Sequence, residues 1–309
     1  MSYENEYGQF VYSKAPLSSL QEKDWTFYGQ CSISYTYLHA LPDPDRQDYF
    51  AVPYGQDPLQ RMDIHHLKSE HREKRPVIFF IHGGGWTTED KSNTRFYALE
   101  WIKNGFTVVS INYRLAPNVN HPTQIEDCSM ALKWVIDNIK EYGGDPDRIA
   151  LIGHSAGAHL AALLLTGEKW HMKYDIDIRK VKCCIPVSGI YDFSLHENYL
   201  PPILESSILA MLGNSDKIDC SPITHVTGKE PPCLIMHGGD DWLVPRSNSI
   251  NFYNKLIEKG NKHAQLNIVP GYWHCNMMLG YDKEGHKPAE IINAYLAEML
   301  QVYGGNDNK

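Results

Sequence analysis

Short apolar runs alternate with helical patterns along most of this chain. Two β-rich runs, 49–55 and 61–67, predict strands that pair as a hairpin at the edge of a sheet. Continuous apolar runs follow, as expected of strands buried on both faces, at 76–86, 106–117, 148–153, 180–189, 231–239 and 264–271. Helical patterns lie between them at 123–144, 156–167, 246–260 and 288–304. Strands that alternate with helices predict an α/β fold, with a mostly parallel central sheet and helices on both faces.

Two segments interrupt this alternation. Residues 1–45 are rich in aromatic side chains and irregular, and residues 194–230 form a long insertion between two predicted strands. In open α/β sheets, ligands bind outside the carboxyl ends of the strands. We therefore expect one domain over residues 1–309, with 1–45 and 194–230 as candidate cap segments over that edge.

Composition and charge exclude several classes of protein. The 309 residues are 42% hydrophobic and 21% charged, and the net charge of −8 argues against a general nucleic-acid or anionic-membrane binder. No apolar run approaches the roughly 20 residues of a membrane span, and the amino terminus shows no signal-peptide pattern. The seven cysteines contain no CxxC pair, and nothing near His65 and His66 resembles HExxH. We therefore expect a cytoplasmic protein with reduced thiols, no metal and no cofactor.

A serine lies between two glycines where a predicted strand becomes a predicted helix. The pentapeptide Gly153-His154-Ser155-Ala156-Gly157 fits G-x-S-x-G, with "RIALI" before it and "HLAALLL" after it. In a strand–turn–helix, this arrangement projects the serine hydroxyl from a sharp elbow and aims the next backbone N–H at the reacting centre. We interpret Ser155 as a nucleophile, and we expect the side chain of His154 to point away from the chemistry.

A serine nucleophile needs a base, and the base needs a carboxylate that orients it. In this fold the order along the chain is serine, acid, histidine. The loop after the run 231–239 offers Asp240 and Asp241, and the loop after the last strand offers His274. His286, at the start of the last helix, is the competing base.

Stabilisation of the oxyanion requires backbone donors. The segment "HGGGW", residues 82–86, ends a predicted strand, and its glycines allow the backbone to approach the substrate closely. With the N–H of Ala156, these donors would form an oxyanion hole. Trp86 is predicted to be either a core residue or a wall of the substrate pocket.

In combination, these motifs resemble the hormone-sensitive-lipase-like esterase branch of the α/β-hydrolases. The resemblance rests on "HGGGW", "NYRLAP", "GGDPDRIALIGHSAGAHLAALLL" and "HGGDDWLVP" and covers roughly residues 49–303. The segments "VPYGQDPLQRMDI", "GHSAGAHLAA" and "VSGIYDF" place the chain close to the small carboxylesterase and kynurenine formamidase (arylformamidase) group.

The resemblance implies a role for each site residue. It implies Ser155 as nucleophile, His274 as base and Asp241, in the D-x-x-V-P pattern, as acid. It implies oxyanion donors at Gly84, Gly85 and Ala156. Formamidases of this kind often carry a bulky residue at the position of Gly85, so the glycine favours a general esterase.

We therefore predict a serine hydrolase that cleaves small to medium carboxylic esters through an acyl-enzyme. The alternative enzyme is an arylformamidase acting on N-formylkynurenine-type formamides. The alternative of another class is a non-catalytic ligand-binding module, as in plant gibberellin receptors, which resemble this family but have lost the catalytic histidine. The presence of serine, acid and histidine favours the enzyme. The expected partner is a small-molecule ester or formamide, and a homodimer is the candidate oligomer.

Overall fold

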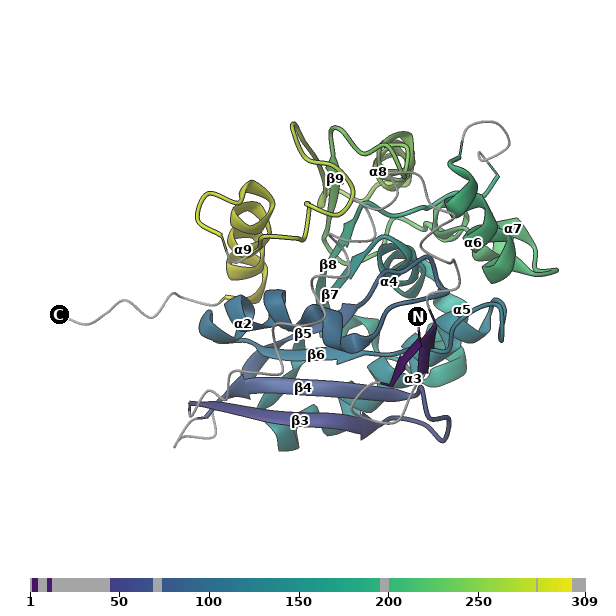
Figure 1. Ribbon diagram of the computed structural model, residues 1–309. Helices are drawn as coiled ribbons and strands as arrows, with labels where there is room; N and C mark the ends of the chain where they lie inside the picture. Colours follow the sequence, from purple (N-terminus) through teal and green to yellow (C-terminus); the bar gives the residue numbers. More distant parts are fainter. Residues whose placement is uncertain are drawn as a thin grey trace.

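The centre of the protein is an eight-stranded sheet (Figure 1). The computed structural model describes residues 2–4, 10–12, 45–68, 74–194, 200–281 and 283–301. The strands of the sheet are β3 (Arg46–Pro53), β4 (Arg61–Leu67), β5 (Arg75–Ile81), β6 (Thr107–Ile111), β7 (Gly144–His154), β8 (Val181–Val187), β9 (Cys233–Gly238) and β10 (Ala264–Val269). Their order across the sheet is β10-β9-β8-β7-β5-β6-β4-β3.

Pairing in the sheet confirms the predicted mixture of directions. β5 to β10 run parallel to one another, whereas β4 pairs antiparallel with both β3 and β6. The edge hairpin expected from the runs 49–55 and 61–67 is therefore β3–β4. Because β5, β7, β9 and β10 are parallel, the loops that follow them all emerge at the same edge of the sheet.

Alternating side chains of the central strands supply two cores. On β5, Val77, Phe79 and Ile81 join one buried cluster, and Ile78 and Phe80 join the other. The period-2 geometry of a strand sends neighbouring side chains to opposite faces, so a continuous apolar run needs cover on both.

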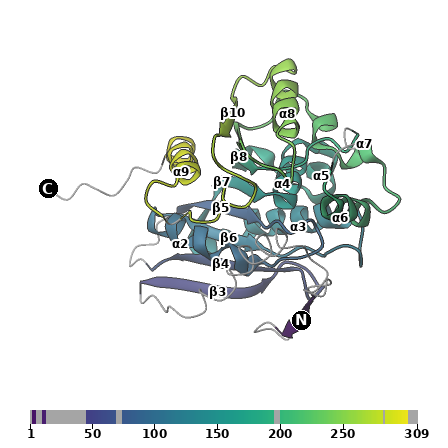
Figure 2. The same ribbon diagram turned by 45° about the horizontal axis from the view of Figure 1, so that its top comes forward.

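Helices cover both faces of the sheet. Figures 1 and 2 show α2 (Arg95–Lys103) and α9 (Lys287–Leu300) on one side. On the other side lie α3 (Thr123–Asn138), α4 (Ala156–Thr166), α5 (Glu168–Tyr174) and α8 (Ser247–Glu258). α4 is buried along its whole length, since the sheet lies on one side of it and neighbouring helices lie on the other. The mostly parallel sheet with helices on both faces is thus confirmed.

Several elements were not anticipated by the hydrophobic pattern. α2 lies where the pattern gave no helix, because only two turns carry its buried residues Tyr97, Ala98, Trp101 and Ile102. The insertion 194–230 contains α6 (Pro202–Leu212), α7 (Lys217–Cys220) and the short 3₁₀ helix η6 (Pro222–His225). Further 3₁₀ turns are η3 (Lys91–Thr94), η4 (Ile139–Tyr142) and η5 (Ile178–Lys180).

The amino-terminal cap prediction falls largely outside the described residues. Within 1–45, the structure describes a two-stranded antiparallel sheet formed by β1 (Ser2–Glu4) and β2 (Phe10–Tyr12), together with residue 45. Its position over the carboxyl edge therefore stays a prediction.

Candidate active site

Ser155 lies on a sharp turn between β7 and α4. Its backbone has φ 55° and ψ −119°, and its N–H donates to the carbonyl of Val187 at 2.9 Å. This left-handed conformation is strained for a residue with a side chain, as expected of an elbow that presents a nucleophile. The elbow packs directly on the strand end beside it, because a Cβ at Gly157 would lie 2.1 Å from the carbonyl oxygen of Ile81. Only glycine fits at that contact.

His274 and Asp241 meet beyond the ends of β10 and β9. The His274 Nδ1 lies 2.8 Å from the Asp241 Oδ2, and the side chain of each residue is at most 3% exposed. The other carboxylate oxygen, Oδ1, accepts the N–H groups of Leu243 at 3.0 Å and Val244 at 2.9 Å. Asp240 is exposed and makes no such contact. The structure therefore brings Asp241, and not Asp240, to the histidine.

Electrostatics hold the Asp241 carboxylate ionised. Burial opposes its charge, but the His274 and His237 imidazoles lower the pKa of Asp241 far below its ordinary range. An ionised carboxylate only accepts, so the His274 Nδ1 carries the proton that is shared with Asp241. The Nε2 of neutral His274 is consequently the basic nitrogen, as required of a group that takes a proton from serine.

His286, the competing base, has a structural role at the start of α9. Its Nδ1 accepts the N–H of Ala289 at 3.2 Å and so caps the amino terminus of α9. Its Nε2 lies 2.8 Å from the carbonyl oxygen of Asn276. Both ring nitrogens are therefore occupied by backbone groups.

The expectation for the side chain of His154 was wrong. Its Nε2 donates to the carbonyl oxygen of His274 at 2.9 Å, and the two imidazole rings lie 4.9 Å apart. Burial, together with the neighbouring His274, lowers the pKa of His154 to about 3. The neutral ring thus joins the elbow that carries Ser155 to the loop that carries His274. Sequence spacing gave no signal for this bond, because the two loops are 120 residues apart in the chain.

Three backbone N–H groups, two in the HGGGW loop and one in the elbow, are the candidate oxyanion donors. In the part of the chain that the structure describes, the N–H groups of Gly84, Gly85 and Ala156 donate no hydrogen bond to the protein. Tyr113 supports this loop through two contacts. Its hydroxyl donates to the carbonyl oxygen of Gly83 at 2.8 Å, and its ring stacks on the ring of His82. These donors are available to an oxyanion.

Of the two interpretations of Trp86, the structure supports the core residue and contradicts the wall of the substrate pocket. The residue is 1% exposed, and its ring packs in the core against His159 and Phe193. Its indole N–H donates to the His159 Nδ1 at 3.0 Å. A buried indole whose N–H is bonded to a helix side chain shapes the loop backbone and does not contact substrate directly.

Within the described part of the insertion 194–230, α6 lies against the HGGGW loop. A Cβ at Gly85, whose φ is +57°, would lie 2.9 Å from the hydroxyl of Ser207 on α6. A backbone hydrogen bond also anchors the same helix, since the N–H of His121 donates to the carbonyl of Met211 at 2.8 Å. α6 therefore contacts the loop that carries Gly84 and Gly85, two of the candidate oxyanion donors.

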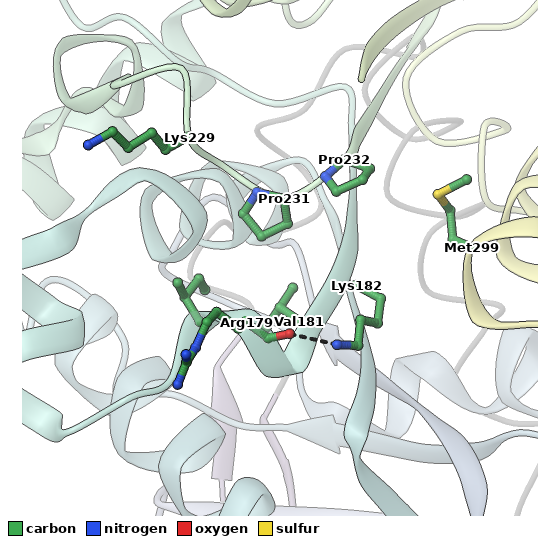
Figure 3. Close-up of a pocket in the computed structure, with 8 residues that line it drawn as sticks. Arg179, Val181, Lys182, Lys229, Pro231, Pro232 and Met299 are labelled. Carbon is green, nitrogen blue, oxygen red and sulfur yellow. Dashed lines mark hydrogen bonds between the residues drawn. The ribbon is translucent and has the colours of Figure 1, made fainter. Parts of the chain in front are cut away.

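A separate surface pocket of about 440 Å³ lies at the opposite edge of the sheet. It is bordered by the first residues of β8 and by Pro231 and Pro232, which precede β9 (Figure 3). Figure 3 also shows the amine of Lys182 bonded to the carbonyl of Arg179. The pocket is remote from the carboxyl ends of the strands and has no part in the chemistry of Ser155.

The described residues contain no group of three or more His, Cys, Asp or Glu side chains arranged to hold a metal ion. Within the same ranges, no helix is both long enough and apolar enough to cross a bilayer.

The fold is that of the α/β-hydrolases. Esterase B from Lactobacillus rhamnosis superposes with a TM-score of 0.75 at 18% identity, and 90% of this chain and 93% of that chain are covered. A truncated carbohydrate esterase from gut microbiota superposes with a TM-score of 0.67 at 23% identity, covering 84% and 99%. At these identities the likeness establishes the fold alone.

A family model narrows this assignment. The model of the BD-FAE family matches residues 62–256, well over half of the chain, and the protein therefore belongs to the BD-FAE family. Its relatives in Mycobacterium tuberculosis include "Probable carboxylic ester hydrolase LipM", 32% identical over 72% of this chain, and "Esterase LipQ", 31% identical over 87%. The chain spans 54% of the length of LipM and 66% of the length of LipQ.

Proposed function

We propose that this protein is a serine hydrolase that cleaves carboxylic esters. The observation that carries the proposal is the 2.8 Å bond between His274 Nδ1 and Asp241 Oδ2, formed at the edge of the sheet where the strained elbow presents Ser155. Membership of a family whose relatives are named as esterases supports the ester as substrate.

The proposed mechanism is a two-step acyl transfer. Ser155 attacks the ester carbonyl while the His274 Nε2 removes its proton, and Asp241 stabilises the imidazolium that forms. The oxyanion accepts the N–H groups of Gly84, Gly85 and Ala156. His274 then protonates the leaving alcohol, and water activated by the same histidine releases the acid from the acyl-enzyme.

The chain is proposed to be one hydrolase domain with a cap over the site. Ser207 of α6 lies close to Gly85, and this contact supports a cap formed by the described part of the insertion 194–230. A cap that rests on the oxyanion loop restricts the length of the acyl chain, so a small to medium ester is the proposed substrate. The cytoplasmic location and the homodimer stay predictions.

A panel of p-nitrophenyl esters tests this function, with N-formylkynurenine included as the formamide substrate. We expect a higher kcat/KM on the C4 ester than on the C12 ester, and a higher value on either than on the formamide. No named relative reported above is a formamidase, so ester hydrolysis is the activity that we propose. A preference for C12 would contradict the cap, and a preference for N-formylkynurenine would contradict the ester.

A further inference from the structure

His159 is a buried histidine, one turn of α4 beyond Ser155. Its side chain is completely shielded from solvent, and both of its ring nitrogens are bonded. Nδ1 lies 3.0 Å from the indole nitrogen of Trp86, and Nε2 lies 2.8 Å from the carbonyl oxygen of Cys220. An indole N–H only donates and a carbonyl only accepts, so the imidazole must be the neutral tautomer with its proton on Nε2.

The two partners of this imidazole belong to different parts of the site. Trp86 follows Gly85 directly and ends the HGGGW segment, and its own carbonyl accepts the N–H of Ala116 at 2.8 Å. Cys220 is the last residue of α7, in the insertion that forms the cap. One ring on the nucleophile helix thus joins the oxyanion loop to the cap.

Packing around the ring leaves it little freedom. The rings of Trp86 and Phe193 lie 5.3 Å and 5.1 Å from the ring of His159, both edge to face. The N–H of Phe193 in turn donates to the hydroxyl of Ser221, next to Cys220. Burial lowers the pKa of His159 to about 3, which keeps the ring neutral and both bonds intact across the neutral range.

We propose that His159 is a positioning residue for ester hydrolysis, holding the oxyanion loop in its productive geometry through Trp86 and fixing the cap to that loop through Cys220. This inference rests on the proposed function. Without an acceptor at Nδ1, the buried indole N–H loses its partner, and Trp86 must shift to regain one. A shift of Trp86 moves the adjoining Gly84 and Gly85 N–H groups relative to the oxyanion, where small displacements reduce transition-state stabilisation.

Two isosteric variants separate the bonds of the ring. In His159→Asn, the side-chain oxygen takes the place of Nδ1, so the acceptor for Trp86 remains while the donor to Cys220 is lost. In His159→Gln, the side-chain nitrogen takes the place of Nε2, so the donor to the cap remains while the acceptor for the indole is lost. Trp86→Phe removes only the indole N–H and keeps an aromatic ring.

The measurements are kcat and KM on a C4 ester, and the affinity for a trifluoromethyl ketone that forms a tetrahedral oxyanion adduct with Ser155. We expect His159→Gln and Trp86→Phe each to lower kcat about tenfold with little change in KM, the effect of one hydrogen bond of typical strength felt in the transition state. Ketone affinity should fall in parallel, the double variant should lose little more than either single variant, and His159→Asn should lose less than His159→Gln.

His171→Gln is the matched control. His171 is another histidine whose Nε2 bonds a carbonyl of α4, that of Leu164, but it lies on α5, outside the proposed site. Its substitution should lower the melting temperature without changing kcat or ketone affinity. Melting temperatures of all variants separate a loss of fold from a loss of positioning.

The proposal is overturned if His159→Gln and Trp86→Phe keep kcat within twofold of wild type, or if activity falls while ketone affinity does not. If His159→Gln does not fold, Trp86→Phe decides alone. If wild type itself neither hydrolyses esters nor binds the ketone, the proposed function fails. In that case, hydrogen exchange of the Trp86 indole N–H measures its hydrogen bond to His159. Rapid exchange of this N–H in wild type refutes the proposal that His159 positions Trp86.

Discussion

Substitution of Asp241 by asparagine tests the acid and the tautomer of the base together. The two oxygens of Asp241 have different partners: Oδ1 accepts two backbone N–H groups, and Oδ2 lies 2.8 Å from the His274 Nδ1. An asparagine keeps its oxygen at the Oδ1 position, since the backbone groups there only donate. Its amide nitrogen then occupies the Oδ2 position and points N–H groups at His274.

The consequence is a histidine of the wrong tautomer. Two donors cannot share one hydrogen bond, so the His274 Nδ1 must give up its proton, and the proton moves to Nε2. The nitrogen that should accept the Ser155 proton is then already protonated, and the imidazolium of the transition state loses its counter-charge. We expect kcat to fall about 10⁴-fold, equivalent to roughly 5.5 kcal/mol of transition-state stabilisation.

Asp240→Asn provides the control, because it removes the same charge one residue away. Asp240 is exposed, and its backbone N–H donates to the carbonyl of Tyr272, a bond that the substitution leaves in place. An exposed charge contributes little, so kcat should stay within about twofold of wild type. The assay is hydrolysis of p-nitrophenyl butyrate, with melting temperatures to confirm that both variants fold. More than a tenth of wild-type kcat in Asp241→Asn, or a larger loss in Asp240→Asn, refutes the reasoning.

Three further predictions address the nucleophile, the elbow and the pH dependence of stability. Ser155→Ala should lower kcat about 10³-fold or more with an unchanged melting temperature; labelling of this variant by a fluorophosphonate would disprove the assignment. Gly157→Ala should destabilise the fold by about 3 kcal/mol in urea denaturation, since its Cβ overlaps the Ile81 carbonyl; a cost under 1 kcal/mol would contradict this packing. Burial lowers the pKa of His82 to about 4 and of His159 to about 3. Below the ordinary histidine pKa of about 6.5, the unfolded chain therefore takes up protons that the folded protein does not. The free energy of unfolding should accordingly be highest above that pH and should fall, as the pH drops toward 4, by about 1.4 kcal/mol per pH unit for each residue. Urea titrations at pH 7, 6 and 5 measure this slope, and a flat profile would contradict it.

The parallel sheet could be predicted from local pattern because the pattern has a local cause. A strand such as β5 is buried on both faces, so every residue from Val77 to Ile81 must be apolar, and the run is visible without knowledge of its neighbours. The elbow is equally local, since a strand, a serine between glycines and a helix lie within one short stretch around Ser155. α2 escaped prediction because its two apolar turns are too short to show a clear period.

The sequence by itself determined the fold class, the order of the chemical groups along the chain and the position of Ser155 at the elbow between strand and helix. It did so because the periodicities of strands and helices, and the steric demands of a glycine-flanked turn, depend on residues that are close together in the chain. Only the tertiary structure chose between Asp240 and Asp241, turned His154 toward His274, and joined Trp86 to Cys220 through His159. Those contacts depend on the side-chain direction of single residues and on loops that lie far apart in the chain, which spacing along the sequence does not encode.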